Sequence, residues 1–99
     1  MSPRIRFTRV AQDDLDRLYE FQLERSVATA ERALEAITKA LDFLRDFPYS
    51  CRKASSDNPF IREMVISFGA SGYVALYEIE GDNIVTILAV RHQREDDYH

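Results

Sequence analysis

The feature that most constrains this fold is a long run of apolar residues at helical spacing in the middle of the chain. Apolar side chains recur every three or four residues over four turns, as in a helix with one buried face. They are Ala30, Ala33, Leu34, Ile37, Leu41 and Leu44. Ser26 or Thr29 can cap the start of this helix. The helix must end near Asp46 or Phe47, because Pro48 lacks an amide donor and disfavours helical geometry in the residue before it.

A second helical pattern precedes the first. Its apolar stripe consists of Leu15, Leu18, Tyr19 and Leu23. The dipole of this helix would favour acidic side chains in its first turn, and the chain supplies Asp13, Asp14 and Asp16. We therefore expect a helix at about residues 11–24. Only a short link around Arg25 to Ala28 separates the two patterns, so the helices should form an antiparallel hairpin.

Strands are expected on both sides of the hairpin. Residues 3–9 place Ile5 and Phe7 between arginines, which is typical of an edge strand with one buried face. After the hairpin, residues 49–60 lack periodicity and are interpreted as a connecting loop. Three further strands then follow at about 63–68, 73–80 and 84–90, separated by glycine-bearing turns. The last strand is apolar on both faces, which favours a central position with packing on both sides.

The predicted order is βααβββ, and the fold class is α+β. A helical hairpin should pack on one face of a small, mainly antiparallel, twisted sheet. The 99 residues fit a single domain, residues 1–99, and leave no room for a second core. No segment approaches the roughly 20 apolar residues needed to cross a bilayer, and the N-terminus lacks the apolar region of a signal peptide. We therefore expect a cytoplasmic protein with no membrane contact.

The charge distribution is uneven along the chain. The formal net charge is −4, and residues 11–46 carry the whole excess, with nine acidic and five basic residues. Basic residues gather in three segments outside the helices, near the start, in the middle and near the end. They are Arg4, Arg6 and Arg9, then Arg52, Lys53 and Arg62, then Arg91 and Arg94. If these three segments meet in the fold, they would form a basic face.

Chemical motifs exclude most classes of enzyme. The chain has no glycine-rich phosphate loop, no HExxH, no metal-ligand spacing and no serine nucleophile elbow, so no metal and no cofactor are expected. The single Cys51 cannot form an internal disulfide and is interpreted as a small packing residue. Acidic residues on the strands, Glu63, Glu78 and Glu80, are interpreted as the solvated face of the sheet. Tyr73 and Tyr77 are assigned to the core rather than to a base-stacking platform.

The charged tail that follows the last strand is the strongest candidate for a functional site. His92 can donate or accept a proton, and Arg91 and Arg94 can hold phosphates or carboxylates through paired hydrogen bonds. These groups suit either RNA cleavage or recognition of an acidic partner. The alternative is that His92 merely ends a strand and that Arg94 pairs with Glu95 or Asp96. Spacing alone does not choose between them.

Several segments together form a recognisable array: the arginine-rich first strand, the acidic hairpin closing on Phe47 and Pro48, and the runs Ile61 to Ile66, Tyr73 to Tyr77 and Ile87 to Arg94. This array resembles the RelE/ParE toxin superfamily over essentially the whole chain. The last run is the most specific. The resemblance implies a toxin of a type II toxin-antitoxin module, of the kind linked to plasmid stabilization and growth arrest. It also implies a cognate antitoxin as partner, in a toxin-antitoxin hetero-oligomer.

The superfamily contains two functional branches. RelE-like members are ribosome-dependent, metal-independent mRNA endonucleases, and that alternative would use Arg62, His92, Arg94, Tyr98 and His99. ParE-like members poison DNA gyrase without covalent chemistry of their own. The net charge of −4 opposes entry into the anionic ribosomal site, and the long hairpin at about 11–46 resembles the ParE branch. The prediction is therefore a gyrase poison, with an inactive binding or regulatory relative as a third possibility.

Two surfaces follow from that prediction. The residues expected to recognise the target are Arg4, Arg6, Arg91, His92 and Arg94. The residues expected to bind the antitoxin are Tyr19, Phe21, Leu23 and Phe43, because they cannot all fit one core-facing stripe.

Overall fold

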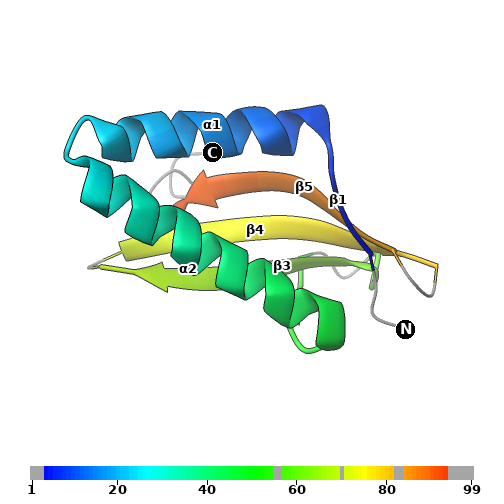
Figure 1. Cartoon of the computed structure of the whole chain (residues 1–99). Helices are drawn as coiled ribbons and strands as arrows, with labels where there is room; N and C mark the ends of the chain where they lie inside the picture. The colour runs from blue at the N-terminus through cyan, green and yellow to red at the C-terminus, as the bar shows by residue number, and fades with distance from the viewer. Residues whose placement is uncertain (1–3, 55–56, 70, 82–83, 94–99) are drawn as a thin grey trace.

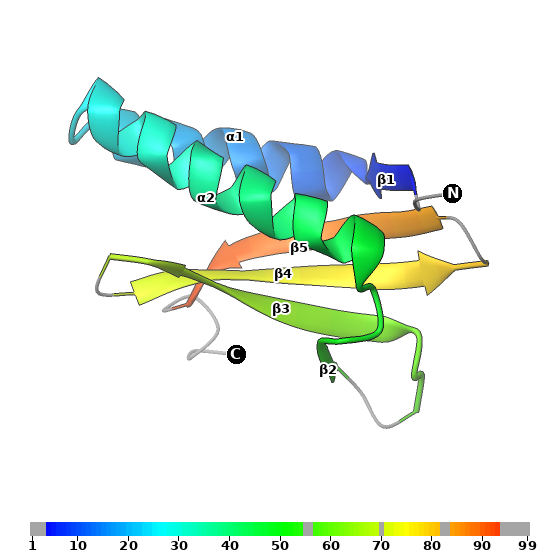
Figure 2. The ribbon, with the colours of Figure 1, turned by 60° about the horizontal axis from the view of Figure 1, so that its bottom comes forward.

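The structure is a computed structural model that describes residues 4–54, 57–69, 71–81 and 84–93. Two helices and five strands follow one another along the chain (Figure 1). The elements are β1 (Arg4–Phe7), α1 (Arg9–Leu23), α2 (Val27–Asp46), β2 (Arg52–Lys53), β3 (Ile61–Phe68), β4 (Ser71–Glu80) and β5 (Ile84–His92). The helical hairpin covers one face of the sheet (Figure 2). The predicted α+β architecture is confirmed.

The sheet is mixed, with strand order β1-β5-β4-β3-β2. β1 pairs with β5 in parallel, and the other three pairings are antiparallel, so the prediction of a mainly antiparallel sheet is confirmed. β1 is an edge strand, as expected, with Ile5 and Phe7 packed against the core and both arginines exposed. β5 lies inside the sheet between β1 and β4, as its apolar sequence predicts, but the expected packing on both faces is wrong, because the helices cover only one face of the sheet.

The predicted start of α1 is wrong by two residues. The helix begins at Arg9 because the Thr8 hydroxyl caps it, accepting a 3.1 Å hydrogen bond from the Ala11 amide. The first turn therefore contains no acidic residue, and the aspartates lie further along the helix. The predicted stripe is also shifted, because Leu23 is 38% exposed whereas Gln22 is buried. The position of the sheet, rather than local hydrophobicity, decides which residues of α1 are covered.

The prediction for α2 is confirmed at both ends. Ser26 is the N-cap residue, and Phe47 follows the last helical residue. Five of the six predicted core positions of this helix are buried, and Leu34 is the exposed one. Tyr73 and Tyr77 lie fully in the core, as assigned from the sequence. None of the described helices is long and apolar enough to cross a membrane.

The expected loop at 49–60 contains a strand that the sequence does not reveal. β2 is two residues long and pairs with β3 through Arg52 opposite Glu63 and Lys53 opposite Arg62. The Ala54 amide extends this pairing with a 2.9 Å hydrogen bond to the Ile61 carbonyl. Two residues are too few for any period to be read, so the observed order is βααββββ and not βααβββ.

Candidate functional site

The two described tail candidates lie on opposite faces of the sheet. In the β4–β5 register, Arg91 stands opposite Val74 and His92 stands opposite Tyr73. Tyr73 belongs to the helix-covered face, so His92 points toward the helices while Arg91 is exposed on the open face. The His92 ring meets the Tyr73 ring edge-on, with centroids 5.7 Å apart at 86°. The remaining tail candidates, Arg94, Tyr98 and His99, lie outside the described residues.

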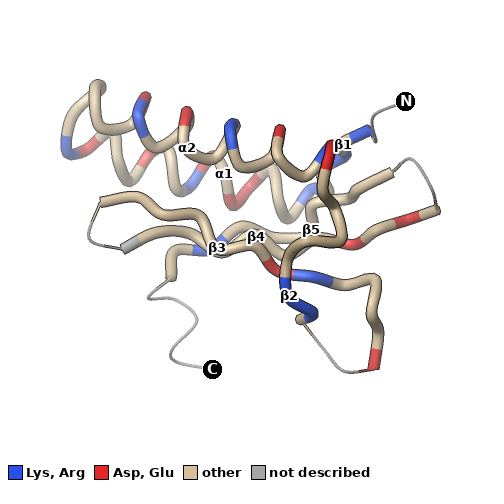
Figure 3. Tube along the Cα trace, turned by 90° about the horizontal axis from the view of Figure 1, so that it is seen from below, with Lys and Arg blue, Asp and Glu red and all other residues tan. Residues whose placement is uncertain are grey.

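The three basic segments do not meet. β1 and β2 form opposite edges of the sheet, about 19 Å apart at a strand spacing near 4.8 Å. Arg6 shares the open face with Arg91, but Arg6 stands beside Thr86, about five residues or roughly 17 Å along β5 from Arg91. In the edge-on view of Figure 3, where the helices lie above the sheet, the basic positions on β1 and those on β2 lie apart. The three basic segments therefore do not form a single basic face.

The Arg62 side chain donates hydrogen bonds to backbone carbonyls of the segment before β3. Its Nε donates to the Pro59 carbonyl at 3.0 Å, and its Nη1 donates to the carbonyls of Tyr49 and Cys51 at 2.9 and 2.8 Å. The guanidinium also lies 5.3 Å from the centre of the Tyr49 ring. Three of its donor contacts thus hold the loop in place. Arg62 stands opposite Tyr77 in the β3–β4 register, about 13 Å along β4 from the residue that faces His92.

Tyr77 strengthens the same loop from the core. Its hydroxyl donates a 2.7 Å hydrogen bond to the Pro48 carbonyl. Burial, and then the neighbouring Cys51 thiol, raise the pKa of the Tyr77 hydroxyl well above its usual value, while the Arg62 charge opposes the rise. The hydroxyl therefore stays protonated and remains a donor at every physiological pH.

Replacing Arg62 with methionine is expected to lower the free energy of unfolding by about 2 kcal/mol, because three carbonyls lose a charged donor. Lysine at this position should recover only part of the loss, since an ammonium cannot reproduce the planar fork. Urea denaturation measures both variants. In the matched control, Arg45→Met removes an exposed arginine that lies 3.8 Å from Asp42 and should cost less than about 0.5 kcal/mol. Equal losses for Arg62 and Arg45 would contradict the structural role of Arg62.

A shallow, open cavity with a mainly apolar lining lies between α2 and β3. Its volume is about 480 Å³. The cavity is lined by Ala40, Phe43, Ser50, Cys51, Arg52, Glu63, Met64 and Val65. Phe43 is 44% exposed, and Phe47, whose ring centre is 5.1 Å from that of Phe43, is exposed as well. The Arg52–Glu63 ion pair, at 2.8 Å, places charge among the lining residues. This combination of an apolar cavity and neighbouring exposed aromatic rings suits a protein partner.

The four antitoxin candidates do not form one patch. Phe21 is 55% exposed and lies with Leu23 at the C-terminal end of α1, next to the start of α2. Phe43 lies near the other end of α2, about 16 residues or roughly 24 Å from Val27. Tyr19 is partly buried. The hairpin therefore presents two separate apolar areas.

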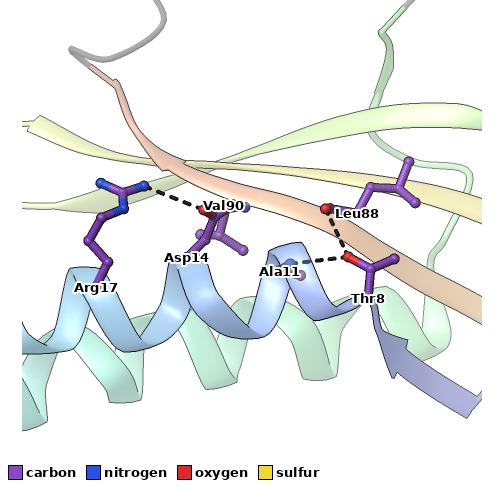
Figure 4. A network of polar contacts seen from close by, with 6 residues as sticks. All are labelled: Thr8, Ala11, Asp14, Arg17, Leu88 and Val90. Carbon is purple, nitrogen blue, oxygen red and sulfur yellow. Dashed lines mark hydrogen bonds and ion pairs between the residues drawn. The ribbon is translucent and has the colours of Figure 1, made fainter.

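Sequence reasoning missed the residues of α1 that hold β5. The Thr8 hydroxyl donates to the Leu88 carbonyl at 3.0 Å, and Asp14 Oδ2 accepts a 3.0 Å hydrogen bond from the Val90 amide (Figure 4). Asp14 Oδ1 also lies 3.5 Å from Arg17. A threonine just before a helical pattern is a recognisable cap signal. Nothing in the local sequence distinguishes Asp14 from the aspartates beside it.

Comparison with known proteins identifies the family. The model for the ParE toxin of type II toxin-antitoxin system, parDE, matches residues 5–97. A curated relative, Toxin RelE3 of Caulobacter vibrioides, is 34% identical over 85 residues, which cover 86% of this chain and 88% of the relative. The protein is therefore a toxin of the type II toxin-antitoxin class. Within the RelE/ParE superfamily, it belongs to the ParE toxin family.

A solved structure shows the same fold. The chromosomal ParDE TA system from P. aeruginosa contains a chain that superposes with a TM-score of 0.70 at 20% sequence identity. The match covers 92% of this chain and 96% of that chain. The fold and the superfamily expected from the sequence are both confirmed.

Proposed function

We propose that this protein arrests growth by poisoning DNA gyrase and that a cognate antitoxin neutralises it. The observation that carries the choice of target is the position of Arg62. An arginine that binds phosphate must offer its fork of donors to the ligand, and Nε and Nη1 of Arg62 already donate to three backbone carbonyls. Arg62 and His92 also lie at different places along β4. Arg62 and His92, the nuclease candidates within the described part of the chain, therefore lie apart.

Electrostatics supports the same choice. A net charge of −4 opposes entry into the anionic decoding site of a ribosome. Gyrase bound to DNA presents anionic surfaces. A few cations at one place on the toxin can contact such a surface even when the whole toxin carries a net negative charge. We assign these contacts to Arg91, His92 and Arg94, with Arg4 and Arg6 as a second group on the edge strand.

A ribosome-dependent mRNA endonuclease is the second candidate, and the name of the relative from Caulobacter vibrioides, RelE3, favours it. In that case His92, Tyr98 or His99 would transfer protons, and Arg62 and Arg94 would balance phosphate charge. A third candidate is a relative that has lost toxicity and serves only as a binding or regulatory module.

Purified protein tested in parallel assays separates these candidates. We expect inhibition of gyrase supercoiling, with accumulation of cleaved DNA, and no cleavage of ribosome-bound mRNA. Cleavage of mRNA with unaffected gyrase would replace the proposal by the nuclease. Inactivity in both assays, with intact antitoxin binding, would favour the binding module.

We further propose that the antitoxin binds the cavity between α2 and β3. β2 pairs with only Arg62 and Glu63, so in the described part of the chain the outer edge of β3 from Met64 to Phe68 has no strand neighbour. An amphipathic segment can place apolar side chains in the cavity and pair its backbone with this edge.

Phe43→Ala is expected to weaken antitoxin binding by about tenfold to a hundredfold, as for an aromatic anchor at an interface. Titration calorimetry with purified antitoxin measures the change. Phe21→Ala, which truncates an equally large and exposed ring in the other apolar area, is the control and should leave the affinity within about twofold. A large loss for Phe21 with none for Phe43 would move the antitoxin site to the end of α1.

A further inference from the structure

The sheet-facing stripe of α1 contains polar residues where apolar ones are expected. Ala11, Asp14, Leu18 and Gln22 follow at intervals of three and four residues, which places them on one face of the helix. Gln22 is only 3% exposed, and the Asp14 side chain is 13% exposed. Burying such groups is costly unless each finds a partner. Both find one near the C-terminal end of β5.

The Asp14 side chain accepts a hydrogen bond from β5 that a neighbouring strand would otherwise accept. β1 pairs with β5 only from Ile84 to Ile87, and the last backbone bond of that pairing runs from the Thr8 amide to the Ile87 carbonyl at 3.0 Å. β5 continues beyond that point to His92. The Thr8 hydroxyl then donates to Leu88, and Asp14 accepts from the Val90 amide, as Figure 4 shows. The side chains of Thr8, the N-cap residue of α1, and of Asp14 in α1 thus continue the edge that β1 leaves open.

Gln22 reaches the same end of the sheet from the last turn of α1. Its Nε2 donates a 3.0 Å hydrogen bond to the Tyr73 hydroxyl, and Tyr73 is 1% exposed. The Tyr73 ring contacts the His92 ring edge-on and stacks with Phe68 at 5.9 Å. Burial raises the pKa of Tyr73, so its hydroxyl remains neutral. Gln22 Oε1 is buried without a hydrogen-bond partner in the described part of the chain, so this polar contact carries a cost that an apolar pair would avoid.

We propose that Asp14, Gln22 and Tyr73 are positioning residues that fix the end of β5, from Val90 to His92, in the orientation in which Arg91 and His92 meet the target. This inference rests on the proposed role of Arg91 and His92 in target recognition. α1 holds the strand end in two ways. Asp14 accepts a hydrogen bond from the Val90 amide, and Gln22 donates one to the hydroxyl of Tyr73, whose ring contacts the His92 ring. A strand end held in advance loses less conformational freedom on binding. The cavity proposed for the antitoxin is lined by residues of α2, of the segment after it and of β3, and Asp14, Gln22 and Tyr73 are not among its lining residues.

Asp14→Leu and Tyr73→Phe test the two contacts separately. In Asp14→Leu, hydrogen exchange of the Val90 amide should accelerate by about tenfold or more, because the amide loses its acceptor. In Tyr73→Phe, the core ring is retained and the hydroxyl is lost, so the NMR signals of the His92 ring should shift or broaden. Both variants should arrest growth at least about tenfold less effectively while binding the antitoxin within about twofold of the wild type. Asp14→Asn, which keeps an acceptor oxygen, should restore both the Val90 protection and the toxicity.

The control is Asp13→Leu, which changes a neighbouring exposed aspartate of the same helix. It should alter neither the Val90 amide nor the growth arrest. The inference is overturned if Val90 and His92 are unchanged in the variants, or if they change while growth arrest persists. Should Asp14→Leu fail to fold, the Tyr73→Phe protein still decides it, through the His92 signals and the growth arrest. The growth-arrest assay does not depend on which target the toxin binds. If the wild-type protein leaves gyrase unaffected, the gyrase proposal is refuted, but the inference about the end of β5 is not.

Discussion

Replacing Arg91, His92 and Arg94 together with alanine is expected to abolish growth arrest while the domain stays folded. Arg91 is exposed, and His92 is only partly buried at the end of β5. Their removal opens no large cavity, so the loss of stability should remain within about 1 kcal/mol. Toxicity should fall by about a hundredfold or more, because interface arginines carry a large share of binding energy. Growth after induction, and thermal unfolding of the purified variant, measure the two effects.

The matched control removes three cations from the exposed face of α2, namely Arg32, Lys39 and Arg45. Lys39 and Arg45 form exposed ion pairs, with Glu35 at 3.0 Å and with Asp42 at 3.8 Å. Such pairs contribute about 0–1 kcal/mol each, and the control therefore changes net charge with little effect on stability. It should remain toxic. Persistent growth arrest by the folded tail variant would refute the role of the tail, and equal loss in the control would show that only net charge matters.

The largest effect on stability is expected from Gly72→Ala. Gly72 pairs with Ser67 next to the turn between β3 and β4. A Cβ at this position would overlap the carbonyl oxygen of Ile66 and would lie 3.1 Å from its carbonyl carbon and 3.3 Å from the Ser67 Cα. These atoms belong to the backbone of a paired strand and cannot rotate away. We expect a loss of about 2–4 kcal/mol, as for overpacking that moves backbone, with Tm lower by roughly 10–20 °C.

Gly69→Ala separates this clash from the general cost of removing a glycine. Gly69 has φ of +62°, and a Cβ there would have no heavy atom within 4 Å. Its replacement should therefore cost only the left-handed backbone strain, about 1–2 kcal/mol. Thermal unfolding of both variants checks the order. A smaller loss for Gly72 than for Gly69 would mean that the β3–β4 pairing adjusts around the new side chain.

Several parts of the fold can be read from the chain because they depend on local pattern. α2 has a cap, a stripe and a proline that act within a few residues, so Ser26 and Phe47 mark its limits without reference to the sheet. The alternating strands likewise place Tyr73 and Tyr77 in the core. α1 is different, because its buried face depends on where β5 lies. Gln22, rather than Leu23, is covered because it faces the sheet.

The sequence by itself determined the helical hairpin and the four longer strands, since periodicity carries that information, and its resemblance over the whole chain indicated the toxin superfamily. The tertiary structure decided which polar groups are used and for what. β2 forms only because β3 offers an edge to pair with, and the basic segments lie apart because the strand order separates β1 from β2. Asp14 binds an amide 76 positions away, and Arg62 binds carbonyls 11 and 13 positions away. Hydrogen bonds between such distant positions leave no periodic trace in a sequence, so only the folded chain shows them.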